Sequence, residues 1–338
     1  MFTLNKKLKE VVGLDIGSHS IKIASIFKES DKPLLTAYNV KQIPFSGEQP
    51  VNEGQLIKEA LSETGINPSE VNISLSGSNV IVRFISLPKM TKDQLENAMI
   101  FEAERYIPFN INEVILDFII IDDAEEGQMN VLLAAAKRDF VQGRIELFQK
   151  LGIEIGIIDV SAFAAFNAFT SANTVADDKG TAFLDLGHSQ TNVLVTTGNI
   201  PRFTRVIQIG GNDITRAIAE DMGVDRQKAD ELRVNGGGED SEKVDQSVFA
   251  VLDELVKEMR LSFGYFENKH NTPVSDVYCS GGMISQKGLV EYLQEKMGMQ
   301  FNVWNPIAGV NIAESIPEES TNAVSAQLAV SIGLALRE

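Results

Sequence analysis

Two short polar stretches of this chain carry the residue types that hold phosphate. In the first stretch, an apolar run is followed by Asp15, Gly17, Ser18, Ser20 and Lys22. Glycine lets the backbone approach an anion closely, serine adds hydroxyl and amide donors, and lysine adds a positive charge. A carboxylate such as that of Asp15 suits Mg²⁺, which usually binds one or two carboxylates and keeps several waters. By itself, this pattern is equally typical of an ordinary hairpin turn.

The second stretch repeats this pattern later in the chain. Another apolar run is followed by Asp185, Gly187 and Ser189, and Asp185 follows Asp15 by about half the length of the chain. An offset of this size is about one domain length, so the repeat predicts two related halves. A nucleotide between the halves would have its phosphates held from both sides, with Asp15 and Asp185 facing a magnesium ion through water.

The region after the second stretch offers further candidates for nucleotide binding. Gly210 and Gly211 precede Asp213 at the start of a predicted helix, and paired glycines there suit the close approach of a ligand. Lys228 and Glu231 lie on a later predicted helix, from which they can reach a ribose or a base. The alternative is that these two charges form a solvated helix face, as charges on helices usually do.

A third glycine element follows a predicted strand at residues 274–280. Gly281 and Gly282 precede Met283 and a further helix. A backbone without side chains at these positions lets a flat adenine ring lie against the chain. Paired glycines are common in turns, so this element gains its weight from the two phosphate turns that precede it.

Asp159 is the candidate catalytic residue. It ends a predicted strand at residues 153–158 and precedes an apolar helix at residues 160–169. The ordinary role of an aspartate in that place is the helix N-cap. The alternative role is to orient the water that attacks the terminal phosphate, because α/β folds place their chemistry where strands end at a cleft.

Other catalytic and metal-binding patterns are missing from the sequence. There is no G-x-x-x-x-G-K-[ST] phosphate loop, no G-x-S-x-G elbow and no H-E-x-x-H pair. The histidines are His19, His188 and His270, and the two that lie in the phosphate turns are expected to face solvent. We therefore expect neither a structural metal nor a catalytic nucleophile.

The composition is that of a globular protein with an acidic surface. The 338 residues are 43% hydrophobic, which suffices for about two domains. A formal net charge of −17 argues against a surface that binds nucleic acid or anionic lipid. The single cysteine, Cys279, fits a reducing compartment, and no segment approaches the ~18 to 20 apolar residues of a membrane span. These features predict a cytoplasmic protein.

The predicted elements divide the chain into two similar halves and an insert. Each half begins with three strands, which we place at residues 11–16, 20–28 and 34–43 and at residues 181–186, 191–197 and 202–209. A small α+β insert separates the halves. We expect an α/β fold with a first domain at residues 1–70 and 138–170, an insert at 71–137 and a second domain at 171–338. A closing helix at 322–336 is rich in small residues and suits packing at the domain junction.

The order of these elements resembles that of the actin, Hsp70 and FtsA superfamily over the whole chain. Within it, residues 101–109, FEAERYIPF, and residues 209–215, IGGNDIT, resemble the PilM family of type IV pilus assembly proteins. The resemblance implies a two-domain actin-like ATPase fold with duplicated RNase H-like halves, an FtsA-like insert, and ATP or ADP with Mg²⁺ in the cleft. It assigns nucleotide binding to Asp15, Gly17, Ser18, Ser20, Lys22, Asp185, Gly187, Ser189, Gly210, Gly211, Asp213, Gly281, Gly282 and Met283.

The resemblance also implies a function. Proteins of this family are cytoplasmic ATP-binding scaffolds with at most slow ATPase activity. They bind the N-terminal cytoplasmic tail of the inner-membrane protein PilN and connect it to the pilus motor and to other inner-membrane components. The chain would then lie at the inner face of the membrane through its partners, without a membrane span of its own, and self-association is a further expectation.

Two alternative functions stay open. One is a filament-forming cell-division protein like FtsA, which should carry a basic amphipathic tail, whereas here the closing helix is followed only by Arg337 and Glu338. The other is a small-molecule kinase of the same superfamily, which would need an acceptor-binding segment and a committed catalytic aspartate. Only Asp159 is a candidate for that aspartate. We therefore favour the scaffold.

We expect the partner's tail to bind the insert and the adjoining face of the first domain. The insert departs from the repeated plan of the halves, and its predicted helix brings Met99, Phe101, Tyr106 and Phe109 into one neighbourhood. Some of these side chains must fill the core of the insert. The others, beside a strand at residues 80–87, can line an apolar groove for an extended peptide. The alternative is that all four are core.

Overall fold

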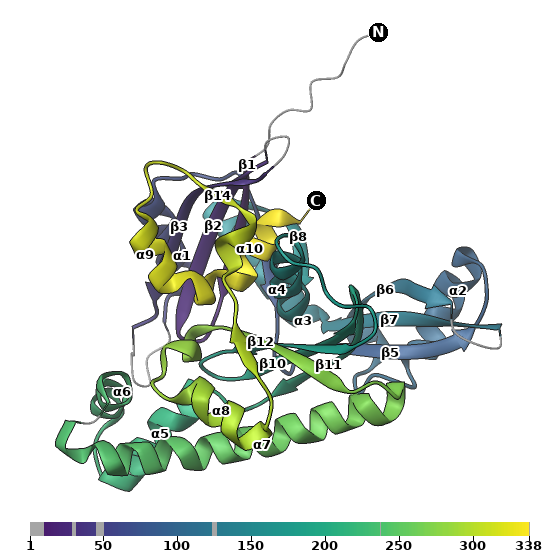
Figure 1. Ribbon diagram of the computed structural model, residues 1–338. Coiled ribbons are helices and arrows are strands. Elements are labelled where there is room, and N and C mark those ends of the chain that lie inside the picture. The colour runs from purple at the N-terminus through teal and green to yellow at the C-terminus, as the bar shows by residue number, and fades with distance from the viewer. Residues whose placement is uncertain (1–9, 29–31, 45–50, 124–126, 237, 338) are drawn as a thin grey trace.

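Two β-sheets with the same strand order form the two halves of the molecule (Figure 1). The computed structural model describes residues 10–28, 32–44, 51–123, 127–236 and 238–337. The first sheet runs in the order β14 (Asn311–Ile312), β3 (Leu34–Gln42), β2 (Ser20–Phe27), β1 (Glu10–Ile16), β4 (Glu70–Leu75) and β8 (Glu154–Val160). The second runs in the order β11 (Ile200–Ile207), β10 (Thr191–Thr197), β9 (Gly180–Leu186), β12 (Val274–Ser280) and β13 (Phe301–Val303).

The two sheets also share their strand directions. In the first, β3, β2 and β1 are antiparallel, and β4 and β8 continue the sheet in parallel. In the second, β11, β10 and β9 are antiparallel, and β12 and β13 continue in parallel. The central strands β1 and β9 are apolar runs covered on both faces, as parallel pairing with helices on each side requires. The predicted α/β fold with duplicated halves is confirmed.

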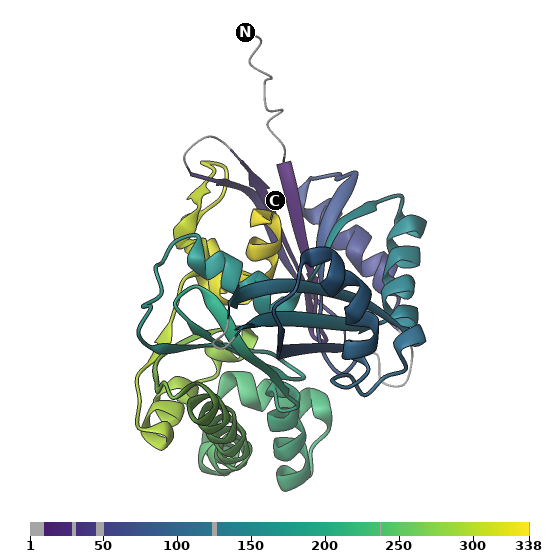
Figure 2. The ribbon, with the colours of Figure 1, turned by 90° about the vertical axis from the view of Figure 1, so that its right-hand side faces the viewer.

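The insert is a three-stranded antiparallel sheet with one helix (Figure 2). Its strands lie in the order β5 (Val80–Pro88), β7 (Gln128–Lys137) and β6 (Val114–Asp123), and its helix is α2 (Lys92–Ala103). The helix begins after Thr91 because Thr91 and Gln94 form a reciprocal capping box. Met99 is buried, and Tyr106 and Phe109 pack against the core of the insert. Phe101 is 74% exposed, so the alternative that all four large side chains are core is wrong.

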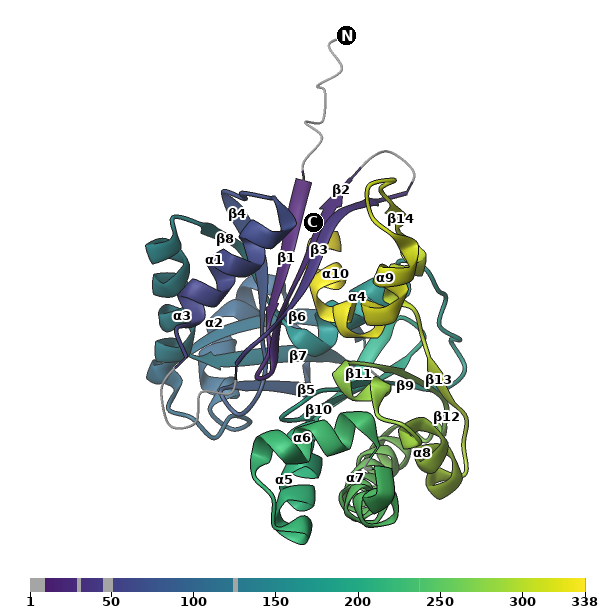
Figure 3. The same ribbon diagram turned by 90° about the vertical axis from the view of Figure 1, so that its left-hand side faces the viewer.

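Helices cover both faces of the first sheet (Figure 3). One face carries α1 (Glu53–Thr64) and α3 (Arg138–Leu151), and the other carries α4 (Ser161–Thr170) and α10 (Ala329–Leu336). The helices of the second half are α5 (Gly211–Met222), α6 (Arg226–Asn235), α7 (Ser241–His270) and α8 (Leu289–Met297). The shorter helices are α9 (Glu318–Val324) and the 3₁₀ turns Ile111–Glu113, Gly238–Asp240, Gly282–Ser285, Pro306–Gly309 and Ser325–Leu328. Within the described ranges, no helix is both long and apolar enough to cross a bilayer.

The helix α10 completes the first half of the molecule. It packs so closely against β1 and α4 that only glycine fits at two positions. A Cβ at Gly13 would overlap the carbonyl oxygen of Ser331, and a Cβ at Gly333 would overlap that of Ala164. The predicted closing helix at 322–336 is wrong in its length. A 3₁₀ turn at Ser325–Leu328 interrupts it, and α10 begins only after that turn.

The sheet pairing changes two boundaries of the predicted domains. The prediction starts the insert at residue 71, but β4 pairs with β1 and β8 in the first sheet, so the insert begins after Leu75. The prediction assigns residues 171–338 to the second domain, but β14 pairs with β3 and α10 packs on β1. The other boundaries stay predictions.

We expect Gly333→Ala to destabilise the protein by about 2 to 4 kcal/mol, because the added methyl group must displace the backbone of α4. Gly143→Ala is a matched control, since Gly143 lies in α3 and a Cβ there meets no atom within 4 Å. Better helix propensity should leave that variant as stable as the parent or more stable. Urea unfolding followed by circular dichroism measures both. Equal stability of the two variants would contradict the packing assigned to α10.

Candidate functional site

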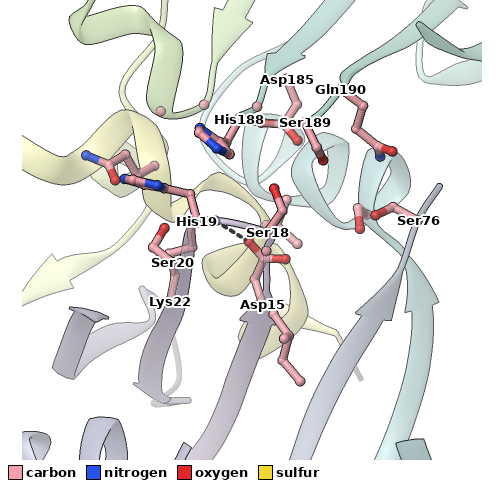
Figure 4. A pocket seen from close by; sticks show the side chains of 18 of the residues that line it. Asp15, Ser18, His19, Ser20, Lys22, Ser76, Asp185, His188, Ser189 and Gln190 are labelled. Atoms are coloured by element: carbon pink, nitrogen blue, oxygen red, sulfur yellow. Dashed lines mark hydrogen bonds and ion pairs between the residues drawn. The ribbon is translucent and has the colours of Figure 1, made fainter. Parts of the chain in front are cut away.

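A cleft of about 670 Å³ lies between the two halves, and the two predicted phosphate turns face each other across it (Figure 4). The predicted nucleotide-binding residues that line it are Asp15, Gly17, Ser18, Ser20, Lys22, Asp185, Gly187, Ser189, Gly211, Gly281, Gly282 and Met283. The fold thus gathers residues that are far apart in the chain. That they bind a nucleotide stays a prediction.

The two turns share one backbone geometry. The N–H of Gly17 donates to the carbonyl of Ser20 at 3.0 Å, and that of Gly187 donates to the carbonyl of Gln190 at 3.0 Å. A Cβ at Gly187 would lie 2.7 Å from the oxygen of Gln190, so this tight turn requires glycine. Two equivalent turns therefore present their polar groups to the same space.

Asp15 and Asp185 are the carboxylates of these turns. Lys22 Nζ lies 3.0 Å from Asp15 Oδ2, whereas Asp185 Oδ2 accepts a hydrogen bond from Asn192 Nδ2 at 3.1 Å. Burial raises the pKa of Asp185, and the nearby carboxylate of Asp15 raises it further. A cation between the two turns would relieve this repulsion.

The donor set suits a magnesium ion that keeps much of its water. Within the part of the chain that the structure describes, no group of three or more His, Cys, Asp or Glu side chains is placed to hold a metal. Mg²⁺ commonly binds one or two carboxylates together with phosphate oxygens and water. Asp15 and Asp185 fit that pattern, and their role as its ligands stays a prediction.

The glycines near residue 281 play two different parts. Gly281 has a φ of +102°, and a Cβ there would lie 2.7 Å from Asp185 Oδ1, so the turn itself requires glycine. A Cβ at Gly282 would project into open space. Gly282 therefore leaves room at the cleft. The next residue, Met283, also lines the cleft and lies close to Gly211.

Gly210 and Asp213 support the second turn and do not line the cleft. A Cβ at Gly210 would overlap the carbonyl oxygen of His188, so glycine lets α5 start against the turn. Asp213 Oδ2 accepts a hydrogen bond from the N–H of Gly210 at 2.9 Å, as the third residue of a helix often does. Their contact with a nucleotide stays a prediction.

Lys228 and Glu231 also lie outside the lining of the cleft. They are exposed and pair with each other at 3.4 Å on α6. Arg233 lines the cleft instead, where it donates to Asp230 at 2.9 Å and to Thr215 at 3.1 Å. The sequence contained one indication that Arg233 faces inward. It lies one helical turn after the small residue Ala229, which is buried, and so shares its face of α6.

Asp159 lines another cavity, and neither predicted role fits its position. Its Oδ2 is paired with Arg337 Nε at 3.0 Å, and its Oδ1 accepts from the N–H of Val160 at 2.7 Å. Burial raises the pKa of this carboxyl, and Arg337 opposes the increase. The N-cap of α4 is Val160, which has no side-chain cap. Ser161, two residues on, is the residue that reaches the cleft.

Several residues of the cleft were not singled out from the sequence. Glu53 and Arg144 form an ion pair there, although they come from α1 and α3. Ser161 Oγ donates to Ser74 Oγ at 3.0 Å, at the ends of β8 and β4. Gln327 reaches the cleft from the C-terminal part of the chain. No local pattern marks these residues, because only the sheet order brings them together.

His19 and His188 contact each other across the cleft, so the prediction that they face solvent is wrong. Their ring centroids lie 4.5 Å apart, and the rings stack at an angle of 29° (Figure 4). Burial lowers the pKa of both imidazoles, that of His188 to about 4. Both rings are therefore neutral near pH 7.

A second cavity, of about 640 Å³, lies where the insert meets both halves, and we call it the apolar groove. The insert contributes β6 and β7, and the first half contributes the end of β8 and α4. The second half contributes Asn199, which precedes β11, and Ile200 and Pro201 at the start of β11. Arg337 and Asp159 form a charged pair in its wall. The groove lies between the insert and the adjoining face of the first half, where the sequence predicts a peptide site. None of Met99, Phe101, Tyr106 and Phe109 lines it, and Val80 is its only lining residue from the strand at 80–87. Peptide binding in the groove stays a prediction.

Comparison with known proteins identifies relatives over the whole chain. A family model described as type IV pilus assembly protein PilM matches residues 13–338. A solved structure named as a PilM–PilN type IV pilus biogenesis complex aligns with a TM-score of 0.85 at 31% identity, over 97% of this chain and 98% of that chain.

Other proteins match this chain more distantly. MreB 5 of Spiroplasma citri, solved with bound AMPPNP, aligns with a TM-score of 0.52 at 9% identity, over 96% of this chain and 94% of that chain. Cell division protein FtsA of Streptococcus pneumoniae serotype 2 (strain D39 / NCTC 7466) is 25% identical over 260 residues, which are 67% of this chain and 55% of that protein. The match thus spans about half the length of that relative.

We expect acid to destabilise the protein through His188. Its pKa is about 4 in the folded protein, whereas a histidine in an unfolded chain titrates near ~6.5, so protons bind preferentially to the unfolded chain between these values. The stability that depends on the neutral ring is complete above ~pH 6.5 and is lost as the pH falls toward 4. His188→Gln removes this proton uptake. Urea unfolding at pH 7.5 and pH 5 should show a larger loss of stability in the parent than in the variant, and an equal loss would contradict the assignment.

Proposed function

The chain belongs to the PilM family of type IV pilus assembly proteins, and from this premise we propose that it is an ATP-binding scaffold. ATP or ADP with Mg²⁺ lies in the cleft, and the N-terminal cytoplasmic tail of a PilN-like inner-membrane protein lies in the apolar groove. The chain is then a cytoplasmic protein that this partner holds at the inner face of the membrane. It connects the partner to the pilus motor, to other inner-membrane components or to further copies of itself.

The observation that carries the nucleotide part of the proposal is the pair of equivalent turns that meet across one cleft. The first turn contributes Asp15 and two serines, the second contributes Asp185 and Ser189, and Lys22 adds a positive charge. Gly282 leaves open space on the side where a base would lie. A polyphosphate with a hydrated magnesium ion complements this arrangement of charge, because the cation lies between carboxylates and the backbone donors face the anion.

The cleft offers little for rapid hydrolysis. Among the described residues, its lining carboxylates are Asp15, Glu53 and Asp185. Asp15 is paired with Lys22 and Glu53 with Arg144, so neither is free to act as a general base. Asp159 was the candidate for the catalytic carboxylate, but Ser161 is the residue of this segment that lines the cleft. We infer a turnover well below the ~10 per second of a typical enzyme, and phosphate release near that value would contradict the scaffold.

The apolar groove supports the partner part of the proposal. Ile115, Ile119 and Ile120 of β6 line it while being 39%, 62% and 40% exposed. Exposed isoleucines that gather on one strand beside a cavity are typical of a surface that another chain covers. The groove is therefore suited to the apolar side chains of an incoming peptide.

Backbone groups in the groove suit an extended peptide. β6 is an edge strand of the insert, because the sheet order is β5-β7-β6. Consecutive residues from Asp117 to Ile121 line the groove, so the strand presents its edge and not only one face. A peptide can add to such an edge through main-chain hydrogen bonds.

Asn167 of α4 lines the groove, and its buried Nδ2 has no hydrogen-bond partner among the described residues. A buried amide without a partner costs stability, and a peptide carbonyl or side-chain oxygen would satisfy it. This feature supports an occupant that carries its own hydrogen-bond acceptors.

We expect Asp15→Ala and Gly282→Trp to weaken binding of Mg·ATP by at least about tenfold, because the first removes a carboxylate of the cleft and the second fills its open space. Lys228→Ala is the control, since this lysine is exposed and lies outside the cleft. It should bind ATP within about twofold of the parent. Isothermal titration calorimetry on folded variants measures all three. Unchanged affinity in both cleft variants would show that the site is elsewhere.

We expect Ile119→Asp to weaken binding of a synthetic PilN-like tail peptide by about tenfold or more, because an isoleucine that becomes buried contributes roughly 1.5 to 3 kcal/mol. Ile100→Asp is a matched control, since Ile100 is 53% exposed on α2, outside the lining of the groove. It should bind as the parent does. Fluorescence anisotropy measures the affinity, and hydrogen exchange maps the peptide. Protection confined to the second half would place the peptide elsewhere.

A further inference from the structure

The stack of His19 on His188 joins the two halves at the cleft, and the nucleotide contacts proposed above do not account for it. The first turn reads Ser18-His19, whereas the second reads His188-Ser189, in the reverse order. Figure 4 shows the two imidazoles beside each other, with Ser18 and Ser189 toward the aspartates. The reversed order thus gives each turn one serine near the carboxylates and one histidine facing its counterpart.

Both rings are attached to backbone that is held in place. The carbonyl of His19 accepts a hydrogen bond from the N–H of Ile43 at 2.8 Å, beyond the end of β3. The carbonyl of His188 accepts one from the N–H of Asn212 at 2.7 Å, in the first turn of α5. The stack is therefore a contact between two fixed supports, one in each half.

The ring of His188 lies near Gly211, which in turn lies near Met283 of the glycine segment. A Cβ at Gly211 would lie 3.4 Å from Met283 Cγ and 3.6 Å from His188 Nδ1, so the ring of His188 is close to that segment. At a centroid distance of 4.5 Å the two rings are in van der Waals contact, and no atom fits between them. His19, His188 and Gly282 line the same cleft, so a ligand in that cleft shares its space with the ring pair.

The surroundings of the pair suit an anion. The charges of Asp230, Arg226 and Arg233 of α6 act on the pKa of both rings, and that of Lys22 of β2 acts on the pKa of His19. Three of these four carry a positive charge. These cations attract a phosphate that comes near the rings. They also oppose protonation of the rings, which would add further positive charge.

We propose that His19 and His188 belong to the nucleotide site as a latch. Their stacked rings hold the two phosphate turns together, and they separate when the phosphate chain of a nucleotide passes from the turns toward Gly282. This proposal rests on the proposed nucleotide-binding function. The ring contact is lost on opening, so it slows the association of the nucleotide.

Stopped-flow association of a fluorescent ATP analogue with Mg²⁺ tests the latch. His19→Ala and His188→Ala should each raise the association rate constant by roughly two- to tenfold, the range expected for loss of one aromatic pair. The double variant should be no faster than either single variant, because the first substitution already removes the contact. His188→Phe keeps a ring and should retain the rate of the parent. Unchanged rates in the alanine variants, or additive effects in the double variant, would overturn the proposal.

Hydrogen exchange without nucleotide separates this proposal from the proposed function. The N–H groups of Gly17 and Gly187 are hydrogen-bonded within their turns and report on each turn separately. His188→Ala should speed exchange at Gly17, which lies in the opposite half. If the parent binds no ATP, the proposed function fails, and this exchange measurement alone decides the latch. Exchange at Gly17 that is unaffected by His188→Ala overturns it.

Discussion

The fold is organised around two carboxylates that are held facing each other. Asp15 and Asp185 project from equivalent turns, and Lys22 pairs with only the first of them. Like charges at close range are unfavourable unless a cation or a proton intervenes, so the surrounding structure must impose their approach. It does so through the same backbone hydrogen bond in both turns and through Gly281, where only a glycine lets β12 end against Asp185. A site built in this way is matched to a cation and an anion together.

The sequence predicted the features that depend on local geometry. The turns at Gly17 and Gly187 were found because a tight hairpin that holds an anion needs glycine and small polar residues in a fixed order. The duplicated sheets followed from the repetition of that pattern. The capping box at Thr91 is a feature of the same local kind, since it requires two residues at a fixed spacing.

The features that were missed depend on contacts between distant segments. Asp159 and Ser161 are two residues apart, yet Asp159 lines the apolar groove and Ser161 lines the cleft. Gly210 has the composition of a ligand-binding turn, but its lack of a side chain serves the approach of α5 to His188. The apolar groove is formed by three parts of the chain, so a pattern within any one of them could indicate the insert but not the cavity.

The position of α10 has a consequence for the order in which the protein can fold during synthesis. The strands and helices that build the second sheet all lie between residues 180 and 303, so that half has its complete core before the last segment is made. The first half lacks part of its core at that stage, because the helix that covers β1 is α10, which is made near the end of synthesis. The close contacts at Gly13 and Gly333 form only after α10 is made. Contacts of such long sequence separation are slow to form and leave apolar surface exposed meanwhile. On the ribosome, the half that is translated first is therefore the half that is finished last, and a chaperone would find its exposed surface on β1.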